Sequence, residues 1–121
     1  MTILEAIGSV DELVPNTYTQ NEKARWLNTL DGKVYTEVIL THEGADNVTF
    51  EECTDGRDRE LIVPAPYDCI YPLYLEMQIN YYYGEAAKYN NAANAFNAAY
   101  TDFVNHYNRT HLPIQHKRKF W

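Results

Sequence analysis

The strongest constraint in the sequence is a helical repeat of apolar residues between positions 89 and 107. Such spacing places them on one face of an α-helix, and that face must be buried against other elements. We therefore predict a long helix over 85–108, with Phe96 and Phe103 packed in a core against the second and third of three preceding helices. The residues that carry the repeat are Tyr89, Ala92, Ala93, Phe96, Ala99, Tyr100, Phe103 and Tyr107.

Two earlier helices are predicted in the first third of the chain. Apolar residues at helical spacing predict a first helix over 3–13, which a following proline ends. Thr19 and Glu22 have the spacing of a capping box, in which each side chain satisfies the other residue's backbone N–H. A second helix should begin there and continue through Gly32 to about Thr41.

A third helix is predicted over 69–83, where apolar residues again follow helical spacing. Gly84 then favours an antiparallel helical hairpin with the last helix, although one continuous helix through the glycine is an alternative. Periodicity is lost over 45–66, and Asp55-Gly56 is a turn signal between two β-prone pieces. The predicted fold is mainly α: a small four-helix bundle with a β-hairpin or ordered loop between helices two and three, and an extended C-terminal tail.

Charge is distributed unevenly along this acidic chain, whose formal net charge is -7. Six of the ten basic residues and all 17 acidic residues precede position 109, so residues 1–108 carry -11 and residues 109–121 carry +4. We predict a helical domain over 1–108 and a separate extended arm over 109–121. A broad nucleic-acid-binding surface is not expected from such a charge. With no membrane-length apolar run and no secretion signal, we expect a soluble protein made in the cytosol.

Motifs that would indicate catalysis, a cofactor or a metal are missing from the sequence. There is no nucleophile elbow and no glycine-rich phosphate loop, and the histidines and cysteines lack zinc spacing. We therefore expect no enzyme activity, no cofactor and no metal. Cys53 and Cys69 can in principle pair, but free thiols are favoured in a reducing compartment. An acidic cluster without the ligand order of a calcium loop is interpreted as a solvated turn; it comprises Glu51, Glu52, Asp55, Asp58 and Glu60.

The polar face of the predicted last helix is unusual because it is almost uncharged. Solvated helix faces are normally rich in charged residues, and asparagine is a mediocre helix former. Contact with a neighbouring protein through hydrogen bonds, without burial of charge, explains this composition. An ordinary solvent-exposed face is the alternative. The candidate inter-subunit residues are Asn90, Asn94, Asn97, Thr101 and Asn105, and Asn108 continues the same face.

Two stretches of the chain carry a family resemblance. "RWLNTLDGKV" is followed by "THEG", and "VPAPYDCIYPLYLEMQINYYYGEAAKYNNAANAFNAAYTDFVNHYNRTHLP" contains the more recognisable motifs "PYD", "Y-x-x-GE-x-x-x-YNN" and "YNRTH-P". In order and spacing, these motifs resemble the head-tail connector proteins, also called adaptor or head-completion proteins, of tailed phages and prophages of Gram-positive bacteria. The resemblance covers roughly residues 20–113, and "KRKFW" at 117–121 matches no fixed motif.

The resemblance implies a structural virion protein at the head-tail interface, made in the host bacterial cytoplasm. Such proteins form a ring, commonly of twelve copies, below the portal and extend the DNA channel towards the tail. The implied partners are other copies of the chain, the portal protein, a tail-side connector or tail-completion protein, and DNA passing without sequence-specific binding; no membrane is implied. An acidic wall would let DNA slide.

The tail of such a connector docks on the portal, which suggests that role for residues 109–121. We expect this arm to be mobile in the free subunit and ordered on assembly. The portal-docking residues implied are Arg109, His111, Pro113, Ile114, Lys117, Arg118, Lys119, Phe120 and Trp121. An alternative function is a small acidic helical regulatory module whose basic tail contacts a partner protein or nucleic acid.

Overall fold

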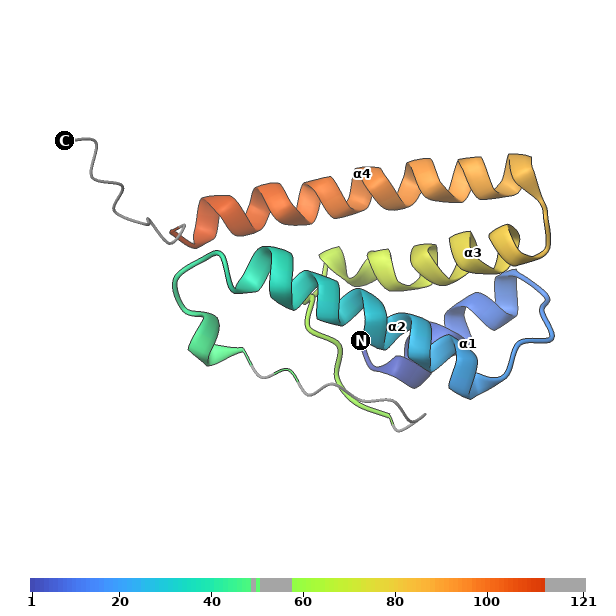
Figure 1. The fold of residues 1–121 in the computed structure, drawn as a ribbon, viewed down its shortest axis with the longest axis horizontal. Coiled ribbons are helices and arrows are strands. Elements are labelled where there is room, and N and C mark those ends of the chain that lie inside the picture. The colour runs from blue at the N-terminus through green and yellow to red at the C-terminus, as the bar shows by residue number, and fades with distance from the viewer. Residues whose placement is uncertain (49, 51–57, 113–121) are drawn as a thin grey trace.

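A computed structural model describes residues 1–48, 50 and 58–112, which form four α-helices (Figure 1). The helices are α1 (Ile3–Leu13), α2 (Gln20–Val34), α3 (Ile70–Tyr82) and α4 (Ala86–Thr110). A π-helical turn, η1 (Tyr35–Ile39), continues α2, and two short 3-10 turns occur at η2 (Ala45–Asn47) and η3 (Tyr67–Cys69). The predicted mainly helical fold is therefore confirmed.

The helix starts follow from local capping. Thr19 accepts a hydrogen bond from the backbone N–H of Glu22 at 3.1 Å, and the Glu22 carboxylate accepts one from the backbone N–H of Thr19 at 3.4 Å. This is the predicted capping box of α2. Thr2 and Glu5 make the same reciprocal arrangement at the start of α1. Both boxes satisfy backbone donors that a helix start leaves unpaired.

Helices α3 and α4 form an antiparallel hairpin and lie side by side along the length of α3, and α4 continues beyond it (Figure 1). Gly84 ends α3 in the left-handed region, with φ at +71°, which glycine adopts without the steric cost that a Cβ atom brings. The alternative of one continuous helix through Gly84 is therefore wrong. Helix α4 continues to Thr110, two residues beyond its predicted end.

The β-hairpin predicted between the second and third helices is not supported. The described part of this region contains η2 and one isolated antiparallel bridge, between Thr2 and Glu60, but no strand. The backbone around position 60 pairs with the N-terminus instead, because Ile3 N–H donates to the Arg59 carbonyl and Leu61 N–H donates to the Met1 carbonyl. The predicted Asp55-Gly56 turn lies outside the described residues.

The hydrophobic core lies between α3 and the pair α1 and α2, and α4 covers α3 from the other side (Figure 1). Phe103 is fully buried, as predicted, whereas Phe96 is only partly buried. Helix α4 packs mainly on α3 and η3, so of the two helices predicted to pack against it, only the third does so extensively. The largest buried apolar side chains are Ile3, Val10, Leu27, Val34, Ile39, Val63, Ile70, Tyr71, Leu75, Ile79 and Phe103.

Candidate functional site

The asparagine-rich face of α4 is exposed along most of the helix. At 3.6 residues per turn, the predicted inter-subunit residues lie within an arc of roughly 80° around the helix axis. They point away from the buried residues of α4, Ala92, Phe103 and Tyr107. All five predicted residues are exposed: Asn90, Asn94, Asn97, Thr101 and Asn105. The structure thus brings them together on one surface, which we call the asparagine face.

The last position of this surface has a specific partner. The Asn108 side-chain oxygen lies 2.6 Å from Nε2 of His42, and the other ring nitrogen of His42 lies 2.6 Å from the Val38 carbonyl. His42 is buried and also packs edge-on against the Tyr107 ring. Asn108 therefore joins α4 to the segment that follows α2, and we do not count it in the asparagine face.

An aromatic groove of about 490 Å³ adjoins the asparagine face. It runs between α2 and α4, with α3 as its floor, and Asn97 belongs to both surfaces. The rings of Tyr74 and Phe96 have their centroids 5.4 Å apart in its wall, and Phe96 stacks on Tyr100 at 5.7 Å. The groove is lined by Leu30, Lys33, Glu37, Tyr74, Met77, Gln78, Tyr89, Ala93, Phe96, Asn97 and Tyr100.

The groove combines apolar rings with a hydroxyl that lacks a partner. The Tyr100 hydroxyl is buried and has no hydrogen-bond partner among the described residues. Burial raises the pKa of Tyr100, and the negative charge of Glu37 raises it further. A buried hydroxyl without a partner costs stability. The rings of the groove are only partly buried, and a bound protein that covered them would remove further apolar surface from water. The groove is therefore suited to protein contact more than to solvent.

A second aromatic group lies where the α1-α2 connection meets the end of α3. Trp26 stacks on Tyr82 with ring centroids 5.6 Å apart, and Tyr18 stacks on Tyr83 at 5.2 Å. Tyr82 and Tyr83 remain exposed although they make these contacts. The chain contains 11 tyrosines, and those of this group lie at the boundary between core and water, where a hydroxyl can stay hydrated.

Two of the predicted portal-docking residues lie in the described part of the chain. Arg109 is exposed in the last turn of α4, so the predicted arm begins inside the helix. His111 is partly buried and stacks on Tyr107 with ring centroids 3.9 Å apart. The carbonyl of Leu112 accepts a hydrogen bond of 2.7 Å from the backbone N–H of Glu43. The other predicted docking residues lie outside the described residues: Pro113, Ile114, Lys117, Arg118, Lys119, Phe120 and Trp121.

The main feature that sequence reasoning missed is a polar cluster around the fully buried Asp31. The Asp31 carboxylate accepts hydrogen bonds from the Tyr71 hydroxyl at 2.5 Å, from Arg59 Nη1 at 2.9 Å and from the Ile62 backbone N–H at 3.1 Å. Arg59 also donates to the Asn28 side-chain oxygen from Nε and Nη2. Burial raises the pKa of Asp31, and the Tyr71 hydrogen bond and the Arg59 charge oppose the shift.

The Asp31 cluster holds the fold together, because each of its hydrogen bonds joins α2 to a distant part of the chain. A sequence signal existed: Asp31 lies in the same helical stripe as the buried residues Leu27, Leu30 and Val34. A charged residue within such a stripe indicates a buried polar contact. Sequence alone did not identify Arg59 and Tyr71 as the partners.

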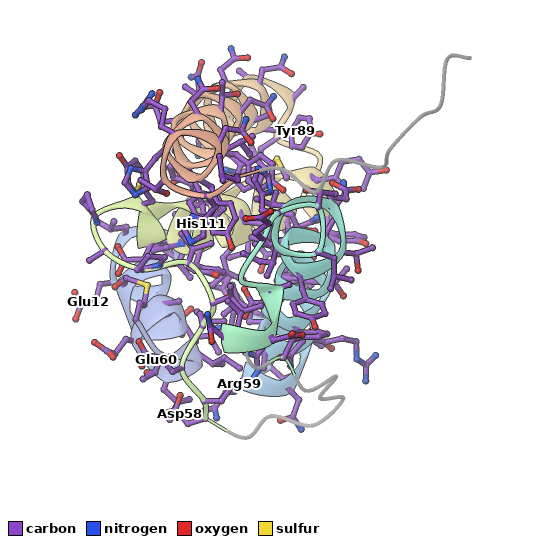
Figure 2. The ribbon with its side chains drawn as sticks, turned by 90° about the vertical axis from the view of Figure 1, so that its left-hand side faces the viewer. Glu12, Asp58, Arg59, Glu60, Tyr89 and His111 are labelled. Carbon is purple, nitrogen blue, oxygen red and sulfur yellow. The ribbon has the colours of Figure 1, made fainter. Side chains whose placement is uncertain are left out.

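Metal-ligating side chains do not gather at one site in the part of the chain that the structure describes. No group of three or more His, Cys, Asp or Glu residues is placed to hold a metal ion within the described ranges. Of the predicted acidic cluster, Asp58 accepts a hydrogen bond from the Leu4 backbone N–H, and Glu60 pairs with the amino group of Met1. Figure 2 shows Asp58 and Glu60 on the same side of the molecule as Glu12, away from Tyr89. The rest of that cluster, and Cys53, lie outside the described residues.

The comparisons with known proteins give no relative for this chain. No family model, no curated protein and no solved structure matches it. In the described part of the chain, no helix is both long and apolar enough to cross a membrane.

Proposed function

We propose that the chain is a structural subunit of a phage head-tail connector, which forms a ring of twelve copies below the portal and extends the DNA channel towards the tail. One observation carries the proposal: a long helix, α4, exposes an uncharged polar face that adjoins an aromatic groove. Together these two surfaces offer a subunit interface that buries little charge.

The chemistry of the asparagine face suits contact between identical subunits. Asparagine side chains both donate and accept hydrogen bonds, so each can pair with a backbone or side-chain group of a neighbour. Exposed uncharged residues cost less to desolvate than the lysines and glutamates that usually occupy a solvent-exposed helix face. A closed ring requires two different surfaces of the subunit to meet. The asparagine face supplies one of them in our proposal.

In the same proposal, the arm over 109–121 docks on the portal. Arg109 begins the arm at one end of the molecule, and the arm carries +4 against -11 in the rest of the chain. A basic segment with aromatic residues can pair with acidic portal groups and provide apolar anchors, which commonly dominate the energy of an interface. The acidic body would repel DNA and let it pass without sequence-specific binding.

The proposal is tested by mixing the purified protein with portal complexes from a phage or prophage that encodes the chain. Electron microscopy should show an added ring on one end of each portal, and the two proteins should sediment together. A parallel experiment with duplex DNA provides the control, because a regulatory module with a basic tail would bind DNA without the portal. Absence of portal attachment, together with DNA binding in moderate salt, would contradict the connector function.

A further inference from the structure

The aromatic groove lies where a four-helix bundle would place one more helix. Helices α2 and α4 both pack on α3, on either side of the groove, and make no extensive contact with each other. The colours of Figure 1 show that α2 and α4 run in the same direction and α3 in the opposite one. In an up-and-down bundle, neighbouring helices are antiparallel and share one core. Three of the four positions are thus taken by α2, α3 and α4, and the groove is the fourth.

The dimensions and the lining of the groove suit the apolar face of a helix. Tyr89 and Tyr100 line it from positions eleven residues apart on α4, so it is about 16 Å long, which is three helical turns. Its volume of about 490 Å³ compares with about 150 Å³ for a cavity that holds benzene, so it can take about three large apolar side chains. Tyr74, Met77 and Phe96 line it and are only partly buried.

None of the four described helices exposes an apolar face that would fill this groove in a second copy. A helix binds in a groove through large apolar residues spaced i, i+3 or i+4, and i+7. On α1 the exposed ones are Leu4 and Leu13, nine positions apart and therefore on opposite sides of that helix. Helix α3 exposes such residues only in its last turn, and α2 and α4 expose none. A fitting helix therefore has to come from a different protein.

Lys33 and Glu37 define the charges that such a helix should carry. Both are exposed and line the groove from the α2 side, four residues apart and thus one turn from each other. Among the described residues, neither has an ion-pair partner. A helix antiparallel to α2 passes Glu37 first and Lys33 one turn later. A basic residue followed four positions later by an acidic one would therefore pair with both.

We propose that the groove is the binding site for an amphipathic α-helix of a different protein. The helix lies antiparallel to α2 and α4, buries its apolar face on Tyr74, Met77 and Phe96, and carries the basic and acidic pair that faces Glu37 and Lys33. Burial of these partly exposed rings supplies the main driving force, and the charge pair sets the direction and register. In the proposed connector, the asparagine face would contact other copies and the groove a different component, but the inference does not require that function.

The inference is tested on the isolated chain with two synthetic peptides of about 20 residues, long enough to form a helix in water. Both peptides carry leucine at i, i+4, i+7 and i+11. The first has lysine followed four positions later by glutamate along one flank of the leucines, and the second has these two residues exchanged. Fluorescence anisotropy should show that the first peptide binds severalfold more tightly than the second. Amide NMR signals should shift around the groove and stay in place on α1.

A charge exchange in the protein makes the test independent of overall stability. Lys33→Glu with Glu37→Lys keeps the net charge, changes only exposed residues, and should reverse the preference between the two peptides. Lys88→Glu with Asp102→Lys, at exposed positions of α4 outside the groove, is the matched control and should leave the preference unchanged.

Three outcomes would overturn the inference. One is that neither peptide binds, and another is that the exchange at positions 33 and 37 does not reverse the preference. The third is self-association of the chain in sedimentation that this exchange abolishes, which would assign the groove to a second copy. Because no portal is present in these experiments, their failure would leave the connector function to its own test.

Discussion

The Tyr71 hydroxyl and the Asp31 carboxylate are joined by a hydrogen bond of 2.5 Å in the interior of the protein, where both residues are fully buried. The same hydroxyl accepts a hydrogen bond of 2.8 Å from the Val63 backbone N–H. Two helices, α2 and α3, and the segment around Val63 are thus fixed by one phenol group. Burial and the adjacent negative charge of Asp31 raise the pKa of Tyr71, so the hydroxyl stays protonated and remains a donor.

Tyr71→Phe should lower the free energy of unfolding by about 1 to 3 kcal/mol, because it leaves the Val63 N–H buried without an acceptor and removes a donor from Asp31. Urea denaturation at neutral pH measures the change. Tyr81→Phe, which removes a hydroxyl from a residue that is 60% exposed, is the control and should have little effect. Equal midpoints for the two variants would show that the Asp31 cluster does not stabilise the fold.

Asp11 should make the stability depend on pH. Burial raises the pKa of Asp11, but hydrogen bonds from Lys23 and Asn16 and the charge of Lys23 outweigh this and hold the pKa below 3.8. Lys23 is buried, with Nζ 2.6 Å from the Asp11 carboxylate. Because the pKa is lower in the folded state, the stabilisation is present above pH 3.8 and is lost as the pH falls through the lower folded value.

Asp11→Asn should therefore destabilise the protein at neutral pH, and the difference from the wild type should shrink as the pH falls below 3.8. Urea denaturation at several pH values measures this. Glu12→Gln removes the same charge from an exposed neighbouring position and controls for net charge. A difference that stays constant down to acidic pH would mean that the Asp11-Lys23 pair does not titrate as its geometry indicates.

Phe103→Ala should cost about 3 to 5 kcal/mol of stability, because Phe103 is 1% exposed and its removal leaves a cavity between α4 and the core. Phe96→Ala should cost clearly less, since Phe96 is only partly buried and lines the groove between α2 and α4. Thermal or urea unfolding of the two variants gives the comparison. The reverse order would mean that the groove closes in solution and buries Phe96.

The parts of the fold that sequence reasoning predicted are those with local causes. The capping box of Thr19 and Glu22 and the glycine at position 84 act within one helical turn, so their spacing is visible in the sequence. The partial burial of Phe96 could not be predicted, because helical periodicity gives a buried face but not how closely a second helix approaches it. The aromatic groove results from the distance between α2 and α4.

The β-hairpin prediction is not supported, and the described part of the region shows a non-local reason. The residues around Arg59 have some strand propensity, but their backbone groups bond to the Asp31 carboxylate and to the first residues of the chain. Strand propensity depends on what a segment packs against, and here it packs on α2 and on the N-terminus.

The uncharged composition of the asparagine face was visible in the sequence, whereas its continuity with the groove at Asn97 required the structure.

The asparagine face should control assembly without affecting folding. Asn90→Glu with Asn94→Glu places two negative charges in the proposed interface, where desolvation of unpaired charge should abolish ring formation. Circular dichroism should show a folded monomer, and electron microscopy of mixtures with portals should show no ring. Asn91→Glu with Ala95→Glu adds the same charges at the same spacing on an exposed part of α4 outside this face, and rings should still form. Normal rings from the first variant would show that the face is an ordinary solvent-exposed surface.

The basic residues of the arm should determine attachment to the portal. Lys117→Glu with Arg118→Glu changes the charge of residues 109–121 from +4 to zero, which removes the attraction to acidic portal groups and should weaken attachment by roughly tenfold or more. Cosedimentation with portal complexes at moderate ionic strength measures the affinity. Arg25→Glu with Lys88→Glu makes the same change at exposed positions of the helical body and should leave attachment nearly unchanged. If both double variants attach equally weakly to the portal, only net charge matters. Undiminished attachment of the Lys117→Glu, Arg118→Glu variant would contradict the portal-docking arm.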